Sequence, residues 1–584
     1  MNEDTLRRDI VRKTFYRFLF PTMISSVSLA VISLTDMAIV GHFLGKEALS
    51  AMSIALPLIL VINILSALLG TGAAIFISTQ LGKGNKKICG EIFTNACFFA
   101  LFVSLIVMIL GNIFTKKLMY LCGATDPALQ DNAERYIRPI LIGFIPMVFS
   151  PILNTFLRND SKPKVSMIIV IVAGTINLIG DVFFAAVLKI GLSGIAAASV
   201  LAQTLSAIAA GTVLLRKSSV FKIVKTKISL KLLKSIVSPG SPMAMIFLLQ
   251  VLLTSFINRT LIKCGGVDGV ASYAVIKYII TFIYALFDGV TGAVQPMLGI
   301  YFGEGEKENI KTTSKIAIRT IILIGICLTF ILELFAPQIC EILGAGEGEL
   351  AKTVITSVRI QAVYCVSAAV IAFLNAYYRC TGHAMFSMFI IIMNNCVFPI
   401  ALISVIVRLI NYSVYSVYFG LVASDIATMF FWLLFKKAAV KEKHDEDSST
   451  IIFTKIIPLE EEYVHSLLNA VEKLGDEYDF SPKISYYISI CMEEMIVNTM
   501  QMSKNDSRKY NVDVKIERLT DGEIVIRIRD DFIEFDPTDK TAGSALEAAE
   551  EESFNLLGIG IVKNVAKEYD YIQTIGFNNF RIVL

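Results

Sequence analysis

Residues 28–45 read SLAVISLTDMAIVGHFLG. With its apolar neighbours this run is long enough to cross a bilayer, yet a carboxylate, Asp36, lies near its middle. An unpaired charge in hydrocarbon costs at least about 2.5 to 3.5 kcal/mol, so an acid inside a membrane span is functional by default. The stretch therefore predicts a membrane helix that carries a polar site.

Composition extends this prediction to most of the chain. Of 584 residues, 55% are hydrophobic and 18% are charged, and the apolar residues come in runs. About a dozen runs of roughly 20 residues lie between Phe15 and Phe435, the length that a spanning helix needs. The fold class expected is an all-α membrane protein of about twelve helices, with membrane lipids as its surroundings.

Charges and cysteines exclude other classes. The net charge of +3 is small and the basic residues are dispersed, so no nucleic-acid partner is expected. The ten cysteines contain no C-x-x-C pair, which argues against a zinc site or a disulfide framework. Basic loops at 82–87, 158–164, 216–234 and 435–443 predict that both ends of the membrane part face the cytoplasm. We expect a multi-pass protein of the cytoplasmic (inner) membrane, with a retained basic N-terminus rather than a signal peptide.

The membrane part repeats itself after 221 residues. The matching positions are Pro21 with Pro242, Gly82 with Gly303, Gly84 with Gly305, Lys86 with Lys307, and Leu153, Asn154 and Arg158 with Leu374, Asn375 and Arg379. The spacing predicts two six-helix lobes, 1–220 and 221–440, in parallel orientation. Repeats of this kind are typical of alternating-access transporters.

Four stretches carry a family resemblance: TDMAIVGHFLGKEALSAMSIALPL (35–58), LGKGNKK (81–87), LNTFLRNDSKPK (153–164) and INLIGDVFFAAVLKIGLSGIAAASVLAQ (176–203). In order and spacing they resemble the multidrug and toxic compound extrusion (MATE) transporters. The resemblance covers about residues 10–440. It implies a secondary antiporter, not an enzyme, that exports small organic, often cationic, compounds in exchange for H+ or Na+ and needs no other cofactor.

The acids of the first lobe have no counterpart in the second. Asp36 corresponds to Ile257 and Asp181 to Leu402, so the carboxylates are not needed merely to fold a lobe. Asn177 and Asp181 share a helix face. The family resemblance implies a cation or proton site made of Asp36, Asn177, Asp181 and Ser199, with Pro21 bending the first helix. Asp288 and Asp425 are expected near span ends, exposed to water.

The composition changes at KEKHDEDSST (441–450), which predicts a linker. Residues 451–584 predict a cytoplasmic α/β sandwich: helices at about 459–476 and 483–502, strands KYNVDVKIE (509–517) and EIVIRIRD (523–530) joined through Asp521-Gly522, a helix from about Gly558, and two closing strands.

Three motifs of this domain resemble the GHKL ATPases and their anti-sigma-factor kinase branch: EEMIVN (493–498), RDDFIEFDP (529–537) and LLGIGIVKNV (556–565). The resemblance implies that Glu494 polarises water, Asn498 binds Mg2+, Asp530 accepts from adenine, and Gly558 and Gly560 approach the phosphates of Mg-ATP. Phe532 and Glu534 stand where the family has glycines, and the lid region 538–554 is acidic. The domain is either a nucleotide-binding module with weak ATPase or kinase activity, or a degenerate one that binds a cytoplasmic regulatory protein.

Two other functions remain open from the residues alone. A lipid-linked or glycan flippase would need a basic cavity, and the spans contain few basic residues. A membrane sensor kinase would need a phosphoacceptor histidine, for which only His444 and His465 are candidates.

Overall fold

A computed structural model describes residues 3–122, 126–216, 219–342, 348–410, 412–439, 450–503, 509–519, 522–532 and 560–584. The chain forms two compact units. One contains Phe15–Lys441, and the other contains Glu442–Leu584 together with Met1–Thr14. The expected linker at 441–450 lies outside the described residues except for Thr450, which begins a strand.

The membrane unit is helical because a backbone in lipid must satisfy its hydrogen bonds internally. Ten helices in the described residues are long and apolar enough to span, and two bent helix pairs bring the number to twelve. The helices and π-helical turns are α1 (Glu3–Phe43), α2 (Gly45–Leu65), η1 (Ser66–Thr71), α3 (Gly72–Gly82), α4 (Lys86–Ile113), α5 (Thr115–Leu121), α6 (Pro127–Ile142), α7 (Phe144–Asn159), α8 (Pro163–Val182), η2 (Phe183–Val187), α9 (Leu192–Leu214), α10 (Leu230–Gly303), α11 (Lys307–Ile342), α12 (Glu349–Ala362), α13 (Tyr364–Cys380), α14 (Ala384–Ile392), η3 (Met393–Val397), α15 (Phe398–Leu409) and α16 (Val414–Ala439).

The two bent pairs lie at matching places in the repeat. Helices α6 and α7 meet at 58°, and helices α12 and α13 meet at 48°. Helix α10 contains two spans, divided at Gly266, whose φ of 60° combined with a ψ of −143° is essentially restricted to glycine. The first spans of the two lobes therefore begin at α1 and at Leu230, in line with the repeat read from the sequence.

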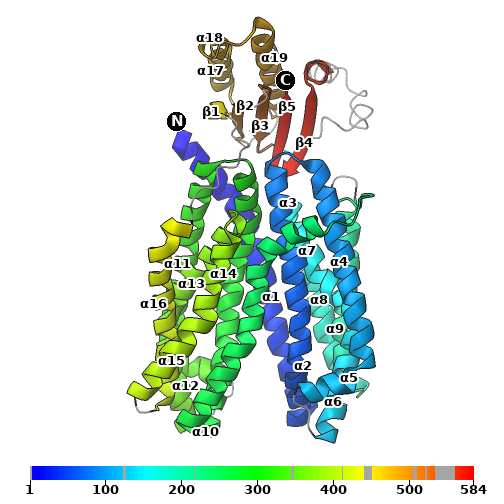
Figure 1. Cartoon of the computed structure of the whole chain (residues 1–584), viewed down its shortest axis with the longest axis vertical. Coiled ribbons are helices and arrows are strands. Elements are labelled where there is room, and N and C mark those ends of the chain that lie inside the picture. The colour runs from blue at the N-terminus through cyan, green and yellow to red at the C-terminus, as the bar shows by residue number, and fades with distance from the viewer. Residues whose placement is uncertain are drawn as a thin grey trace. The chain divides into compact units, whose positions relative to one another are not determined.

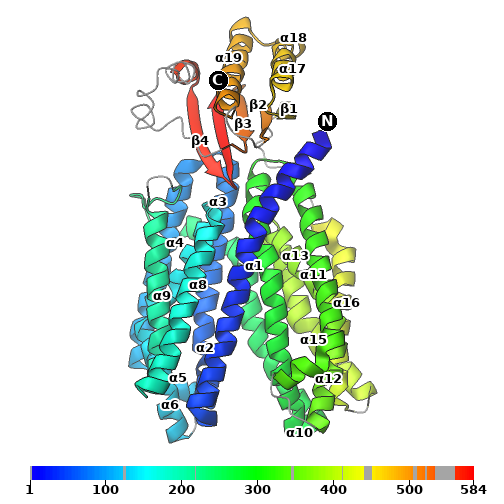
Figure 2. The same cartoon turned by 180° about the vertical axis from the view of Figure 1, so that it is seen from behind.

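The helices gather into two groups, α1 to α9 and α10 to α16, which both views show side by side (Figures 1 and 2). The predicted two-lobe helical fold is confirmed. The backbones of the two lobes come close at two glycines that the repeat relates. A Cβ on Gly82 would lie 2.1 Å from the Ile300 carbonyl oxygen, and a Cβ on Gly303 would lie 2.1 Å from that of Thr79. Only glycine lets the two backbones meet there.

The second unit contains a five-stranded antiparallel sheet in the order β1-β2-β3-β5-β4. Its strands and helices are β1 (Thr450–Pro458), α17 (Glu461–Glu472), α18 (Leu474–Glu477), α19 (Pro482–Ser503), β2 (Asn511–Arg518), β3 (Ile524–Asp530), β4 (Glu568–Thr574) and β5 (Phe577–Val583), with a helical segment at 560–565.

The packing of this sheet follows its sequence pattern. Val512, Val514 and Ile516 alternate along β2 and are fully buried, because they face the apolar sides of the helices, including Leu467 and Ile496. The predicted β2–β3 hairpin is present, and Gly522 in its turn has a φ of 87°. Asp521 lies outside the described residues. The unit thus has a hydrophobic core of its own.

Candidate functional site

The first-lobe site is built on α8, where Asn177 and Asp181 are one helical turn apart and both buried. Asn177 Nδ2 lies 3.3 Å from Asp181 Oδ2 and 3.2 Å from Ser199 Oγ on α9. The amide therefore links the carboxylate to the hydroxyl across two helices. Helix α8 ends just beyond, in the π-helical η2, a type of distortion that often accompanies functional sites.

Asp36 completes this site from α1. Its carboxyl group is in hydrogen-bonding contact with that of Asp181. One oxygen of each group, Oδ1, is buried and has no other partner among the described residues. Two bare carboxylates in contact repel each other, so a proton held between them satisfies both. The structure thus brings together all four residues that the sequence nominated.

A fifth member, Tyr136, was missed by sequence reasoning. It is buried on α6 and lies close enough to feel the charges of both Asp36 and Asp181. No motif marks it, because its proximity depends on how the bent pair α6–α7 packs against the other helices. This buried phenol therefore belongs to the electrostatic surroundings of the two acids.

Pro21 lies within α1. Proline leaves one backbone carbonyl of the preceding turn without its donor, which weakens the helix at that point. The next residue, Thr22, is buried and donates to the Gly289 carbonyl oxygen of α10 at 2.8 Å. A bend at Pro21 would therefore move α1 against the second lobe.

The structure corrects the expected position of Asp288. It lies well inside the span Asp268–Gly303 rather than near its end. It is within electrostatic reach of Arg158 and Arg379, the two arginines that the repeat relates. Two cations therefore balance this carboxylate, which sets it apart from the Asp36–Asp181 pair.

The expected position of Asp425 is also wrong. It lies in the middle of the span Val414–Ala438 and is only 2% exposed. The sequence named this acid but placed it wrongly, because the ends of an apolar run do not fix which residues lie at the middle of the helix. The position equivalent to Asp425 in the first lobe is Thr204, which gives no signal.

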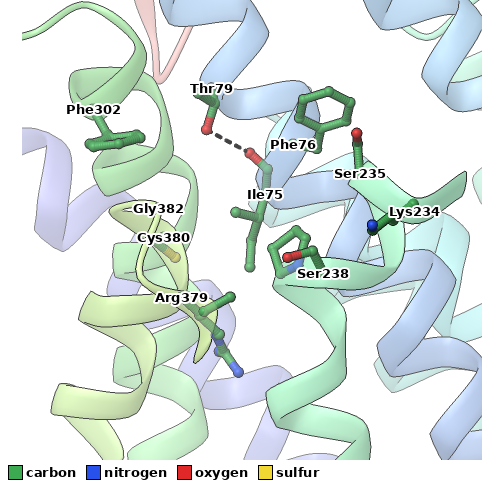
Figure 3. Close-up of a pocket in the computed structure, with 12 residues that line it drawn as sticks. Ile75, Phe76, Thr79, Lys234, Ser235, Ser238, Phe302, Arg379, Cys380 and Gly382 are labelled. Atoms are coloured by element: carbon green, nitrogen blue, oxygen red, sulfur yellow. Dashed lines mark hydrogen bonds between the residues drawn. The ribbon is translucent and has the colours of Figure 1, made fainter. Parts of the chain in front are cut away.

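A pocket of about 380 Å³ lies among the ends of α3, α10 and α13 (Figure 3). Lys234 and the buried Arg379 line it, with the hydroxyls of Thr79, Ser235 and Ser238. Figure 3 shows the Arg379 guanidinium pointing away from Thr79 and Ser235. No carboxylate is among the described residues that line this pocket, so its charge does not suit a cationic substrate.

In the soluble unit, Asp530 at the end of β3 is 1% exposed. Its Oδ1 accepts from Asn578 Nδ2 at 2.8 Å and from the Phe532 backbone N–H at 3.0 Å. Oδ2 is buried without a partner in the described part of the chain. Burial raises the pKa of Asp530 to about 7, against the lowering effect of the Asn578 hydrogen bond. An oriented carboxylate with one oxygen free can accept a donor such as an adenine amino group.

The other nucleotide-site residues are only partly placed. Glu494 is half-buried on α19, and burial followed by the nearby Glu493 raises its pKa. Among the described residues, which do not include 533–559, no atom would lie within 4 Å of a Cβ on Gly560. Gly558, Glu534, the lid region and the side chain of Asn498 lie outside the described residues. The Phe532 ring packs edge-on against the Tyr510 ring, with 5.0 Å between the ring centroids, so this side chain contributes to the packing of the domain.

These features define the class of protein: a two-lobe membrane transporter with carboxylates inside the helices of a lobe. Residues 21–183 and 242–405 each match the MatE family model, and the two matches begin 221 residues apart. The chain belongs to the MatE family. Residues 457–583 match the model of the histidine kinase-like ATPase domain, so a domain of that kind follows the transporter part, which is not an enzyme.

Several curated relatives are named as multidrug resistance or multidrug export proteins. The chain is 24% identical over 342 residues to the probable multidrug resistance protein YoeA of Bacillus subtilis, covering 56% of this chain and 72% of that protein. It is 22% identical over 444 residues to the probable multidrug resistance protein NorM of Thermotoga maritima, covering 74% and 94%.

One similar solved structure is an outward-facing conformation of a multidrug resistance MATE family transporter of the MOP superfamily. Its TM-score is 0.68 at 22% identity, and the match covers 75% of this chain and 98% of that one. At this identity the likeness concerns the fold.

Proposed function

We propose that the chain is an H+-coupled antiporter that exports organic cations through the inner membrane. The observation that carries this proposal is the contact between the Asp36 and Asp181 carboxyl groups. A shared proton makes that contact stable, and its removal leaves two like charges in a low-dielectric lobe. Deprotonation would then change which packing of the lobe is favoured.

The coupling follows from where the site lies. Asp36 and Pro21 are on the same helix, α1. Thr22, the residue after Pro21, donates a hydrogen bond to the Gly289 carbonyl oxygen of the second lobe. Movement of α1 away from Asp181 would therefore act on the contact between the lobes. Exchange requires that the proton and the substrate stabilise different conformations of the two lobes. Each ligand shifts the equilibrium between these conformations only by the difference between its affinities for them.

The test measures efflux of ethidium, a fluorescent organic cation, from proteoliposomes driven by a pH gradient or by a Na+ gradient. We expect the pH gradient alone to drive efflux in the natural chain and Asp181→Asn to lose it. The matched control is Asp131→Asn, the same chemical change at an exposed acid that pairs with Arg135. Efflux driven by Na+ without a pH gradient would contradict proton coupling.

For the soluble unit we propose a regulatory role in which the domain binds an adenine nucleotide with little turnover. Oδ2 of Asp530, which has no hydrogen-bond partner among the described residues, supports binding of the base. When bound, ATP would supply a phosphate chain and its Mg2+, which the four glutamates of region 538–554 oppose by charge. Calorimetric titration of the full chain with Mg-ATP, beside Asp530→Ala, tests this proposal; equal binding by both proteins would contradict the proposed role of Asp530.

A further inference from the structure

A second polar cluster lies inside the second lobe, around Asp425 of α16. Asn394 in η3 donates from Nδ2 to Asp425 Oδ1 at 2.7 Å. Ser367 of α13 donates from Oγ to Asp425 Oδ2 at 3.2 Å. Asn394 Nδ2 also reaches Thr428 Oγ1 at 3.4 Å. Three helices of one lobe thus converge on a single carboxyl group.

The donors around Asp425 are neutral. No Lys, Arg or His among the described residues forms an ion pair with it, and its hydrogen bonds come from an amide and a hydroxyl. Two titratable groups on the other packed helices feel the charge of Asp425: the phenols of Tyr284 (α10) and Tyr364 (α13), which hydrogen-bond to each other.

Two more titratable groups lie beyond these phenols. They are the thiol of Cys365 and the carboxyl group of Asp288, both within electrostatic reach of Tyr284. Neither group can offset a negative charge. A bare carboxylate buried in this way carries a large desolvation cost that neutral hydrogen bonds do not cancel.

The cluster repeats the chemistry of the first lobe at different positions. In the first lobe, Asn177 Nδ2 links the carboxylate of Asp181 to the hydroxyl of Ser199. In the second, Asn394 Nδ2 links the carboxylate of Asp425 to the hydroxyl of Thr428. Each asparagine lies in the fifth span of its lobe and each hydroxyl in the sixth. The carboxylate lies in the fifth span of the first lobe but in the sixth span of the second.

We infer that Asp425, held by Asn394 and Ser367, is a second ion site of the transporter and that the ion it takes is a proton. Both carboxylate oxygens already accept a short-range donor, and each keeps a lone pair that a proton can occupy. The inference rests on the proposed function, because it adds a second proton to the exchange that the Asp36–Asp181 pair performs.

The test is infrared spectroscopy of the full-length protein in lipid vesicles, titrated with acid and base. The carboxylic-acid C=O band reports each buried protonated carboxyl group without requiring transport. We expect one component of this band to be lost in Asp425→Asn and a different component to be lost in Asp181→Asn. The control Asp131→Asn should leave the buried components unchanged.

A second variant keeps the test decisive if Asp425→Asn does not fold. Asn394→Ala retains the carboxyl group but removes its 2.7 Å donor, so the Asp425 component should persist at a shifted frequency. A band unchanged in both variants would overturn the inference. Suppression of the Asp425 component by NaCl, but not by choline chloride, would show a Na+ site and overturn the assignment of the ion.

Failure of this inference is distinguishable from failure of the proposed function. Loss of the Asp425 component with no change in Asp181→Asn would refute the first-lobe site alone. The reverse result would refute the second-lobe site alone.

Discussion

The two lobes share one helical plan and differ in how they hold their acids. In the first lobe two carboxyl groups touch, and Asp36 is only half-buried. In the second lobe a single carboxyl group is buried among neutral donors that satisfy both of its oxygens. Two carboxyl groups in contact repel each other if both are ionised, whereas the single carboxyl group of Asp425 has no like charge in contact with it. This difference predicts that the two lobes, although similar in fold, contribute unequally to ion coupling.

The largest effect is expected for Asp36→Asn. An amide in place of this carboxyl cannot release a proton, so separation of the pair no longer depends on pH. We expect pH-driven ethidium efflux to fall to background, at least a hundredfold, while the amount of protein in the membrane stays normal. Full transport at normal protein levels would contradict a first-lobe site.

Gly303→Val should have a nearly equal effect, by a different route. A valine side chain at this contact would overlap the Thr79 carbonyl, so the lobes could not close at Gly82. We expect transport to be lost, and a cysteine pair placed across this contact no longer to cross-link. Gly211→Ala is the control, because its Cβ would have its nearest neighbour at an ordinary 3.8 Å. Normal cross-linking in Gly303→Val would show that the two lobes can meet at this contact without a glycine at position 303.

Asp425→Asn is expected to have a smaller effect. If the second lobe contributes one of two protons, removing it halves the number of coupled protons without abolishing exchange. Each coupled proton contributes about 1.4 kcal/mol per unit of pH gradient, so the steady-state ethidium ratio should fall about tenfold at a one-unit gradient. Measurement of that ratio at several gradients gives the slope directly. A slope equal to that of the natural chain would contradict a proton coupled through Asp425.

The smallest effect concerns Asp530, a buried carboxyl group outside the membrane spans. Its pKa in the folded domain is about 7, above the ordinary 3.8, so the folded state holds more proton between these values. This contribution to stability is complete below about pH 4 and is lost as pH rises through 7, with a slope of at most about 1.4 kcal/mol per pH unit.

Thermal unfolding of residues 450–584, which have their own core, can measure this slope. We expect the melting temperature to fall between pH 5 and pH 8 and Asp530→Asn to remove most of that fall. The exposed Asp476→Asn serves as control. A pH dependence that persists in Asp530→Asn would assign it to another group.

Much of the architecture could be predicted from local patterns. Hydrophobic runs predicted the spans, because each must fill the bilayer and satisfy its backbone alone. The 221-residue repeat predicted the lobes, and alternation in β2 with glycine at 522 predicted the hairpin. The residues of the first-lobe site could be nominated because Asp36 lies inside an apolar run and Asn177 and Asp181 are neighbours on one helix face, and the family motifs supplied Ser199.

Tertiary packing decided what remained. Whether Asp36 meets Asp181, whether Tyr136 joins them, and whether Asp425 finds Asn394 all depend on which helices touch and at what depth. The sequence by itself determined that acids lie in the membrane, because hydropathy is a local property. Only the structure decided which acids lie against each other and which lie within reach of arginine, because the energy of a buried charge depends on neighbours that are distant in sequence.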